Sequence, residues 1–148
     1  MKKIKKILLL TLALLGIIIL AVFIFIQTLK PDYEGEKQLQ NLTDEVSVYY
    51  DFYGIPHIYG QNEEDAIRAL GYVHAQDRLW QMELLRRVAR GGLSEVFGSE
   101  LLLTDKFFLS LGIDEASVKT ISQQQRTNKS IRLTEAYLDG VNQFIENG

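Results

Sequence analysis

The residue types that most often carry chemistry are few in this sequence. Its only histidines, His57 and His74, stand seventeen residues apart and lack the H-E-x-x-H spacing of a zinc-binding helix. We therefore predict that both make structural hydrogen bonds rather than a metal pair. No serine lies in a G-x-S-x-G nucleophile elbow. The sequence contains no cysteine, which excludes disulfides, thiolate metal sites and a cysteine nucleophile.

One carboxylate, Asp77, stands on an apolar helix face. Between residues 62 and 90 the 3.6-residue period places on one face the side chains of Ala66, Ala69, Leu70, Val73, Trp80, Leu84 and Val88. Asp77 falls in the middle of that face, where an ionised carboxylate is costly to bury unless it is paired. Either the face packs on an element that carries a partner for Asp77, or it is exposed there; we favour the first. A structural ion pair explains such a charge more often than a catalytic acid does.

The ends of this helix are marked by capping residues. Asn62 is a good N-cap, and the carboxylates of residues 63–65 favour the first turn because of the helix dipole. Gly91 and Gly92 end the helix. Gly71, inside it, costs roughly 1 kcal/mol relative to alanine. We therefore expect Gly71 to mark close packing against a neighbouring backbone.

A short β hairpin is predicted before the helix. Residues 46–50 and 55–59 are rich in β-formers, and residues 51–54 form a turn between them. Pro56 cannot donate to a strand ladder, so it belongs at an edge or at a strand start. The aromatic residues of this region suggest a stacking platform, but we predict strand and core packing for them. They are Tyr49, Tyr50, Phe52, Tyr53, Tyr59 and Tyr72.

Two further helices are predicted after the long one. Residues 101–111 are apolar, and Thr104 is their candidate N-cap. Residues 133–145 form an amphipathic helix that tolerates Gly140, with Thr134 as its candidate cap. Its apolar side consists of Leu133, Ala136, Tyr137, Val141, Phe144 and Ile145.

The N-terminus has the pattern of a membrane anchor. Residues 1–6 are basic, and an apolar run begins at residue 7; its twenty residues up to 26 span about 30 Å as a helix, which matches a bilayer core. We predict a cytoplasmic basic segment at 1–6, an uncleaved transmembrane signal anchor at 7–29, a polar tether at 30–45 and an exported domain at 46–148. The alternative is a long signal peptide cut at an atypical site.

Composition limits the remaining functions. The chain has 148 residues, a net charge of -3 and 47% hydrophobic residues, which is enough for one domain at most. No basic patch follows Lys30, so we predict no nucleic-acid partner. Glu83 and Arg87 are spaced i,i+4 and are predicted to form a surface ion pair.

An ordered series of motifs resembles the N-terminal part of the penicillin acylase (penicillin amidase) family. The series runs in order and with similar spacing over residues 46–148. It consists of YGIPHIY at 53–59, GYVHAQDRLWQME at 71–83, Arg86-Arg87, GLSEVFG at 92–98, Asp105-Lys106 with Leu111-Gly112, and AYLDGVNQFI at 136–145. A lone YGIPHI would be a weak signal, whereas the ordered series is a strong one.

The resemblance implies an N-terminal nucleophile hydrolase. In that family an exported precursor is cleaved into an α and a β chain, and the first residue of the β chain, mostly serine, is the nucleophile with its own α-amine as base. Members hydrolyse amide bonds of N-acyl compounds, either β-lactam side chains or acyl-homoserine lactones. A structural calcium often accompanies the complete enzyme.

The resemblance covers only the front of the α chain. It therefore transfers no catalytic, substrate-binding or metal-binding residue to this sequence, and no cofactor. The step at Gly98-Ser99 lies well before the family's cleavage point, so we interpret Ser99 as a loop residue. The expected fold is an α+β, mostly helical fragment from the periphery of an αββα sandwich.

We accordingly expect a membrane-anchored, single-pass α-chain fragment, inactive alone, whose unmatched apolar face covers a missing β chain. The alternative function is that of a bitopic membrane protein with a small extracytoplasmic binding or scaffold domain. Roughly 100 residues after the tether make such a domain marginal even when complete. Independent folding as a monomer would favour the scaffold, whereas dependence on a partner would favour the fragment.

Overall fold

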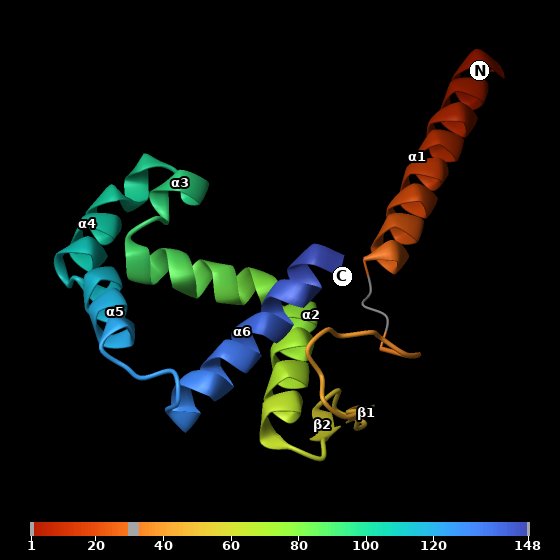
Figure 1. Cartoon of the computed structure of the whole chain (residues 1–148). Helices are drawn as coiled ribbons and strands as arrows, with labels where there is room; N and C mark the ends of the chain where they lie inside the picture. Colours follow the sequence, from red (N-terminus) through yellow and green to blue (C-terminus); the bar gives the residue numbers. More distant parts are fainter. Residues whose placement is uncertain (1, 30–32, 148) are drawn as a thin grey trace. The chain divides into compact units, whose positions relative to one another are not determined.

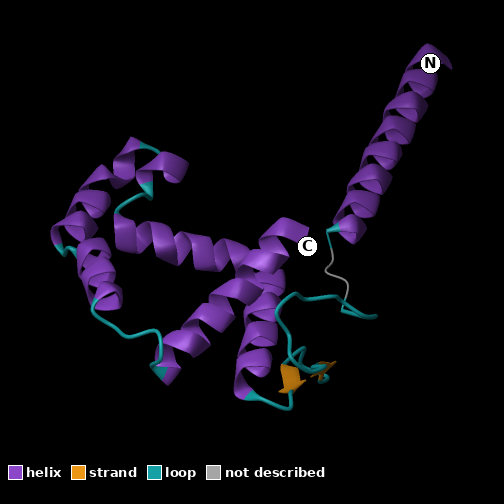
Figure 2. Ribbon diagram, in the orientation of Figure 1, coloured by secondary structure: helices purple, strands orange, loops and turns teal. Residues whose placement is uncertain are grey.

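The computed structural model describes residues 2–29 and 33–147 and divides the chain into two compact units, Met1–Glu36 and Lys37–Gly148. Figures 1 and 2 show a chain that is largely helical, with one small pair of strands. This agrees with the predicted α+β, mostly helical fragment. Part of the predicted tether, residues 30–32, lies outside the described residues.

The first unit is built on one long helix, α1 (Lys2–Thr28). Its apolar side chains are exposed, and the hydroxyls of Thr11 and Thr28 donate to carbonyl oxygens three residues earlier. Among the described residues it is the one helix long and apolar enough to cross a membrane, judged by length and composition. A signal sequence near the N-terminus would meet the same criterion.

The second unit begins with the hairpin of β1 (Ser47–Tyr50) and β2 (Pro56–Tyr59), paired antiparallel with Val48 opposite Ile58. Asp51 organises the turn: its carboxylate accepts hydrogen bonds from the backbone N–H groups of Tyr53 and Ile55, each at 2.9 Å. Gly54 adopts a φ of 74°, which favours glycine. The predicted strands, the turn and the position of Pro56 at a strand start are confirmed.

The helix α2 (Glu63–Arg90) crosses α6 (Lys129–Asn147), and the small core of the unit lies at this crossing. The buried apolar residues there are Ala69, Val73, Ala75, Ala136 and Val141. The crossing is close because glycine occupies both sides of it. A Cβ atom on Gly71 would overlap the Tyr137 carbonyl oxygen, and one on Gly140 would overlap the Arg68 carbonyl oxygen.

The predicted close packing of Gly71 is thus confirmed, and Gly140 is required rather than tolerated. The predicted caps at both ends of α2 are also confirmed: the Asn62 side chain accepts from Asp65 N–H, and Gly91 ends the helix in the left-handed region with a φ of 63°. In α6 the predicted cap is wrong. Thr134 lies inside the helix, where its hydroxyl donates to the Ser130 carbonyl.

A bend divides α2 into two halves with different surroundings. Arg78 has φ -145° and ψ 30°, which interrupts the helix, and Figure 1 shows α2 changing direction along its length. The predicted apolar face holds before the bend, where Ala69 and Val73 are buried. Beyond the bend Trp80 departs from it and is 56% exposed, whereas Leu84 and Val88 remain half-buried. A 3.6-residue period cannot be extrapolated across a break in the helix.

Short helices continue the chain after α2. They are α3 (Ser94–Phe97), the 3-10 helix η1 (Ser99–Leu101), α4 (Leu102–Ser110) and α5 (Ile113–Ser122). The predicted helix at 101–111 is confirmed as α4, which contacts α2. The Thr104 cap is wrong because α4 already begins at Leu102. The α5 helix has no counterpart among the predicted elements.

Candidate functional site

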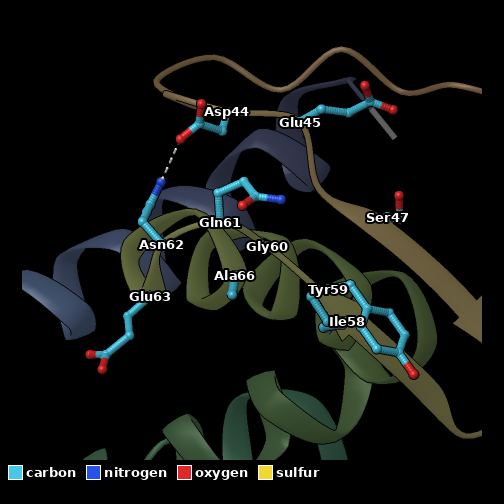
Figure 3. Close-up of a pocket in the computed structure, with 10 residues that line it drawn as sticks. All are labelled: Asp44, Glu45, Ser47, Ile58, Tyr59, Gly60, Gln61, Asn62, Glu63 and Ala66. Atoms are coloured by element: carbon cyan, nitrogen blue, oxygen red, sulfur yellow. Dashed lines mark hydrogen bonds between the residues drawn. The ribbon is translucent and has the colours of Figure 1, made fainter.

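An open groove lies between the segment before β1 and the connection from β2 to α2, with a volume of about 930 Å³ (Figure 3). It is lined by Asp44, Glu45, Ser47, Ile58, Tyr59, Gly60, Gln61, Asn62, Glu63 and Ala66. Figure 3 shows that the carboxylates of Glu45 and Glu63 point away from each other. No histidine is among the lining residues, so Ser47 has no imidazole base there. The groove therefore lacks both a converging cation site and an activated nucleophile.

A buried carboxylate, Asp65, stands directly behind this groove at the start of α2. It is 1% exposed and accepts hydrogen bonds from the N–H groups of Thr43, at 3.0 and 3.1 Å, and Asp44, at 2.8 Å. The side-chain amide of Asn62 donates to it at 2.6 Å. Burial alone would raise the pKa of Asp65, but these hydrogen bonds and the nearby Arg68 charge lower it below its ordinary value. Asp65 is therefore a fully engaged structural anion.

Arg68 extends this network to α6. Its guanidinium donates to Asp65 at 3.2 Å through one amino nitrogen and to Asp139 at 2.7 Å through Nε. Asp139 also accepts from the Asn41 side chain at 3.1 Å. Burial would raise the pKa of Asp139, but the hydrogen bonds from Arg68 and Asn41 lower it. Residues 40–44, which we call the strap, are thereby tied to both helices.

The strap is also held by a reciprocal amide contact. Gln40 N–H donates to the Gln143 side-chain oxygen at 2.6 Å, and the Gln143 side-chain nitrogen donates to the Gln40 carbonyl at 3.0 Å. These paired contacts give both the oxygen and the nitrogen of the buried Gln143 amide a hydrogen-bond partner. The function of this constellation is to hold the start of the unit on the α2–α6 crossing, and none of its groups is left over for acid–base chemistry.

Both histidines make the structural hydrogen bonds that were predicted. His57 Nε2 lies 3.3 Å from Asp51 in the hairpin turn. His74 Nδ1 lies 3.1 Å from the hydroxyl of Tyr137 and so joins α2 to α6. Burial lowers the pKa of His74, the Arg78 charge lowers it further, and the Asp77 charge opposes this. Within the described ranges, no group of three or more metal-ligating side chains converges.

The second half of α2 carries a separate ionic network. Glu83 accepts from Arg86 at 2.7 and 2.8 Å and from Arg87 at 2.7 Å, while Arg87 also donates to Glu95 of α3 at 2.7 Å. Hydrogen bonding from Arg86, supported by both guanidinium charges, lowers the pKa of Glu83 to about 2. The predicted pair of Glu83 and Arg87 is confirmed, as part of a network that connects α2 to α3.

Asp105 fixes the chain that follows α2. Its carboxylate is 3% exposed and accepts from the N–H groups of Leu93 and Ser94, both at 2.8 Å. Hydrogen bonds donated by Ser94 lower the pKa of Asp105, although burial alone would raise it. The backbone of Asp105 also passes so close to Gly91 that a Cβ atom there would lie 2.6 Å from the Asp105 carbonyl oxygen. Asp105 therefore acts as a remote cap for α3.

The polar contacts described above are structural, and comparison with known proteins shows to which family the chain belongs. The penicillin amidase family matches residues 45–148. The chain belongs to the penicillin amidase family. The hairpin and the α2–α6 crossing fall in the matched region, whereas the strap at residues 40–44 and α1 lie before it.

Three relatives define the extent of the likeness. Penicillin acylase 2 proenzyme from Pseudomonas sp. (strain SE83) is 39% identical over 123 residues, which cover 83% of this chain and 16% of the relative. An acyl-homoserine lactone acylase QuiP from Pseudomonas putida is 37% identical over 78% of this chain and 14% of its own length. Penicillin G acylase from Escherichia coli is 35% identical over 70% of this chain and 12% of its own length. The chain thus spans less than one fifth of each.

A solved structure supports the fold of this penicillin amidase region. The thermostable penicillin G acylase from Alcaligenes faecalis superposes with a TM-score of 0.59 at 27% sequence identity. The superposition covers 69% of this chain and 53% of the matched chain. The predicted fold class is confirmed by this likeness together with the helices and hairpin described above.

The residues singled out in the sequence are dispersed in the structure. Ser99, interpreted as a loop residue, begins the 3-10 helix η1. His57 lies in β2 and His74 lies in α2, so the three residues belong to different elements. The predicted strand and core packing of the hairpin aromatics is wrong for the turn and for the outer face of the strands. Phe52 is 96% exposed, and Tyr49, Tyr53 and Tyr59 are exposed as well. Only one face of the hairpin is turned to α2, so the other remains uncovered within this unit.

The carboxylates that hold the fold were missed in the sequence. From the sequence, Asp65 was predicted only to interact favourably with the helix dipole. Its spacing from Asn62 is that of a capping box, which predicts mutual hydrogen bonds, and the structure has them: Asp65 N–H donates to the Asn62 side-chain oxygen, and the Asn62 side-chain nitrogen donates to the Asp65 carboxylate. Asp105 is a lone acid in the apolar run LLLTDKFFL, which signals a buried anion with backbone donors. Nothing in the local sequence announces the pairing of Arg68 with Asp139, because the two lie 71 residues apart.

Proposed function

We propose that this chain is the first part of the α chain of a penicillin-acylase-type amidohydrolase, and that a β chain supplies its catalytic nucleophile. The observation that carries the proposal is the family match over residues 45–148, although the chain spans only 16% of the length of the relative from Pseudomonas sp. (strain SE83).

The proposed reaction is hydrolysis of a linear amide bond in an N-acyl compound. The relatives are named penicillin acylases and acyl-homoserine lactone acylases, so the substrate is a β-lactam side-chain amide or an acyl-homoserine lactone. The β-chain nucleophile attacks the amide carbonyl while its own α-amine accepts the proton of the nucleophile and passes it to the leaving amine, so that an acyl-enzyme forms. Water then attacks the acyl-enzyme and releases the carboxylic acid.

The chain by itself is proposed to be inactive. Amide hydrolysis by this route needs a nucleophile beside a base and donors for the oxyanion. Ser47, which lines the groove, and Ser99, which begins η1, have no histidine partner, because His57 contacts Asp51 and His74 contacts Tyr137. A structural calcium in the complete enzyme is proposed to take its ligands from other segments, because no group of three or more histidine, aspartate or glutamate side chains converges among the described residues.

We further propose that residues 7–29 anchor the chain in the cell membrane, with residues 1–6 on the cytoplasmic side and the domain of residues 46–148 exported. The support is the length and apolar composition of α1 and the lysines that precede its apolar run. Residues 30–45 connect the two parts.

The test is to purify the full chain from its native membrane and to determine the intact mass and N-terminal sequence of every chain that accompanies it. A larger chain that begins with Ser, Thr or Cys, together with hydrolysis of penicillin G or of an acyl-homoserine lactone, would support the proposal. A single species near 16.9 kDa without hydrolysis would overturn the enzymatic function and leave a membrane-anchored scaffold.

A further inference from the structure

The strap, residues 40–44, is held largely through its backbone. At one end the N–H and the carbonyl of Gln40 contact a side-chain amide, and at the other the N–H groups of Thr43 and Asp44 contact a carboxylate, at distances of 2.6 to 3.1 Å. Between the two ends Asn41 turns the chain with a φ of 62°, a conformation that asparagine adopts more readily than most residues. The strap therefore lies on the α2–α6 crossing as a bound peptide would.

The surface beneath the strap is polar, buried and contributed by both helices. Asp65 of α2 is 1% exposed and Gln143 of α6 is 8% exposed, and they hold the two ends of the strap. Asp139 of α6 accepts from the side chain of Asn41. In the part of the chain that the structure describes, every buried side-chain nitrogen or oxygen has a hydrogen-bond partner. We call Asp65, Asp139 and Gln143 the strap site, because the strap supplies partners that these side chains would otherwise have to find in water.

The strap and the strap site belong to different parts of the chain. The strap site lies within the penicillin amidase match, which begins at residue 45, whereas the strap lies before it. Residues 35–38, which lead to the strap, are exposed and belong to no helix or strand. The hairpin joins the strap to α2, so the strap binds at an effective concentration on the order of millimolar. Individually modest contacts are therefore enough to keep it in place.

We infer that the strap site is a peptide-binding site that the strap occupies in cis, and that the strap opens and closes as one latch while the α2–α6 crossing stays folded. The ligand class is a polypeptide backbone that offers two consecutive N–H groups to Asp65 and an N–H and carbonyl pair to Gln143. The inference concerns this chain alone and does not depend on a second chain.

The latch opens as one unit because its two ends are only a few residues apart. Once the Gln40 end is released, the contacts of Thr43 and Asp44 must order the whole segment alone, against its conformational entropy. The crossing relies on other contacts, namely the close approach of Gly71 and Gly140 to the facing backbones. An open latch adds the strap to the linker before the domain, up to about 17 Å when extended, and uncovers the strap site.

The first test is hydrogen exchange at single amides of the full chain in detergent. The unchanged chain is compared with Gln143→Ala, which removes the contacts at Gln40, and with Gln81→Ala, the matched control at an exposed glutamine of α2. We expect Gln143→Ala to accelerate exchange at Thr43 and Asp44, at the opposite end of the strap, about tenfold or more. Gln81→Ala should change it by less than about twofold.

Two results of this experiment would overturn the latch. Unchanged exchange at Thr43 and Asp44 in Gln143→Ala would mean that the two ends bind independently. Equal acceleration throughout α2 and α6 would mean that the strap opens only when the crossing unfolds.

The second test examines the peptide-binding site. A protease recognition sequence inserted after Asp44 allows the full chain to be nicked behind the strap, and a fluorescent peptide of residues 37–44 is titrated onto nicked and uncut chain. The uncut chain's own strap competes in cis, so we expect saturable binding to the nicked chain and binding at least about tenfold weaker to the uncut chain. N-methylation of Thr43 in the peptide removes a donor and should weaken binding about tenfold or more. N-methylation of Gln38, which lies outside the strap, should change binding by less than about twofold.

Binding that does not saturate, or equal binding of the two methylated peptides, would show that the crossing carries no peptide site. Loss of the helical circular dichroism signal on nicking would show that the strap is part of the cooperative fold and not a latch.

Discussion

Gly71 of α2 lies directly against the backbone of Tyr137 in α6, with no room for a Cβ atom between them. The relationship is repeated one turn away, where Gly140 of α6 lies against the backbone of Arg68 in α2. Two glycines therefore set the distance between the helices. That distance in turn places Arg68 beside Asp139 and His74 beside Tyr137. These two polar contacts between α2 and α6 therefore depend on the absence of two methyl groups.

Replacing either glycine by alanine should destabilise the fold. Alanine would gain roughly 1 kcal/mol in helix propensity, but the overlap with a backbone oxygen forces the helices apart and costs about 1–3 kcal/mol or more. We expect Gly71→Ala and Gly140→Ala to lower the urea midpoint of the full chain in detergent. Gly16→Ala in α1 is the control, because nothing lies within 4 Å of its Cβ position. Equal midpoints for all three variants would show that the crossing is looser than described.

Loss of the Asp65 charge should release the strap. Asp65→Asn removes an anion that is 1% exposed and replaces an acceptor of the Thr43 and Asp44 N–H groups by an amide. The expected loss in free energy of unfolding is roughly 2–4 kcal/mol. Asp114→Asn, at an exposed pair, should change it by less than about 0.5 kcal/mol. Comparable losses for both variants would contradict a special role for Asp65.

The same carboxylate predicts an acid limit of stability. The pKa of Asp65 is lowered in the folded state, so the unfolded state binds its proton more readily. The stability that Asp65 contributes is therefore complete above its unfolded pKa of about 3.9 and is lost as the pH falls through the folded pKa. Unfolding curves between pH 5 and 3 should show this decline in the unchanged chain and a flatter profile in Asp65→Asn.

Local patterns predicted the elements of this chain but not what holds them together. The hairpin follows from alternating β-formers around a turn, and both ends of α2 follow from Asn62 and Gly91, since each depends on neighbours within a few residues. The bend at Arg78 was not predicted because the sequence there contains neither proline nor glycine. One missed bend was enough to place Trp80 on the wrong face.

The candidate site illustrates the same limit. The motifs of the penicillin amidase family were recognisable because they are ordered along the chain, and the family match confirms them. The strap was not recognisable, because Gln40 and Gln143 are joined over 103 residues and neither carries a local signal. Burial of polar residues through distant partners is decided by tertiary packing, which a single sequence does not display.

Protonation of His74 should weaken the α2–α6 contact. Burial and the Arg78 charge lower the pKa of His74 in the folded state, so the unfolded state binds the proton more readily. Its contribution is complete above the unfolded pKa of about 6.5 and is lost as the pH falls through the folded value. The measurement is an NMR titration of His74 together with urea unfolding from pH 8 to 5. His74→Gln should flatten the pH dependence, whereas Tyr137→Phe should keep the ring contact and remove only the hydroxyl partner. A pKa at or above 6.5 in the folded chain would contradict the expected direction.

Loss of the Asp105 carboxylate should loosen the chain after α2 without unfolding the crossing. Its two acceptor oxygens hold the N–H groups of Leu93 and Ser94, and no other described side chain replaces them there. Hydrogen exchange measured by mass spectrometry should therefore accelerate about tenfold or more across residues 92–98 in Asp105→Ala. Exchange in the part of α2 before Arg78 should stay unchanged, because its partners are in α6 and the strap. Glu100→Gln, at an exposed acid of η1, is the matched control and should leave both regions as they are. Acceleration throughout α2 and α6 would instead mean that Asp105 stabilises the whole unit, and α3 would then be part of the same cooperative fold as the crossing.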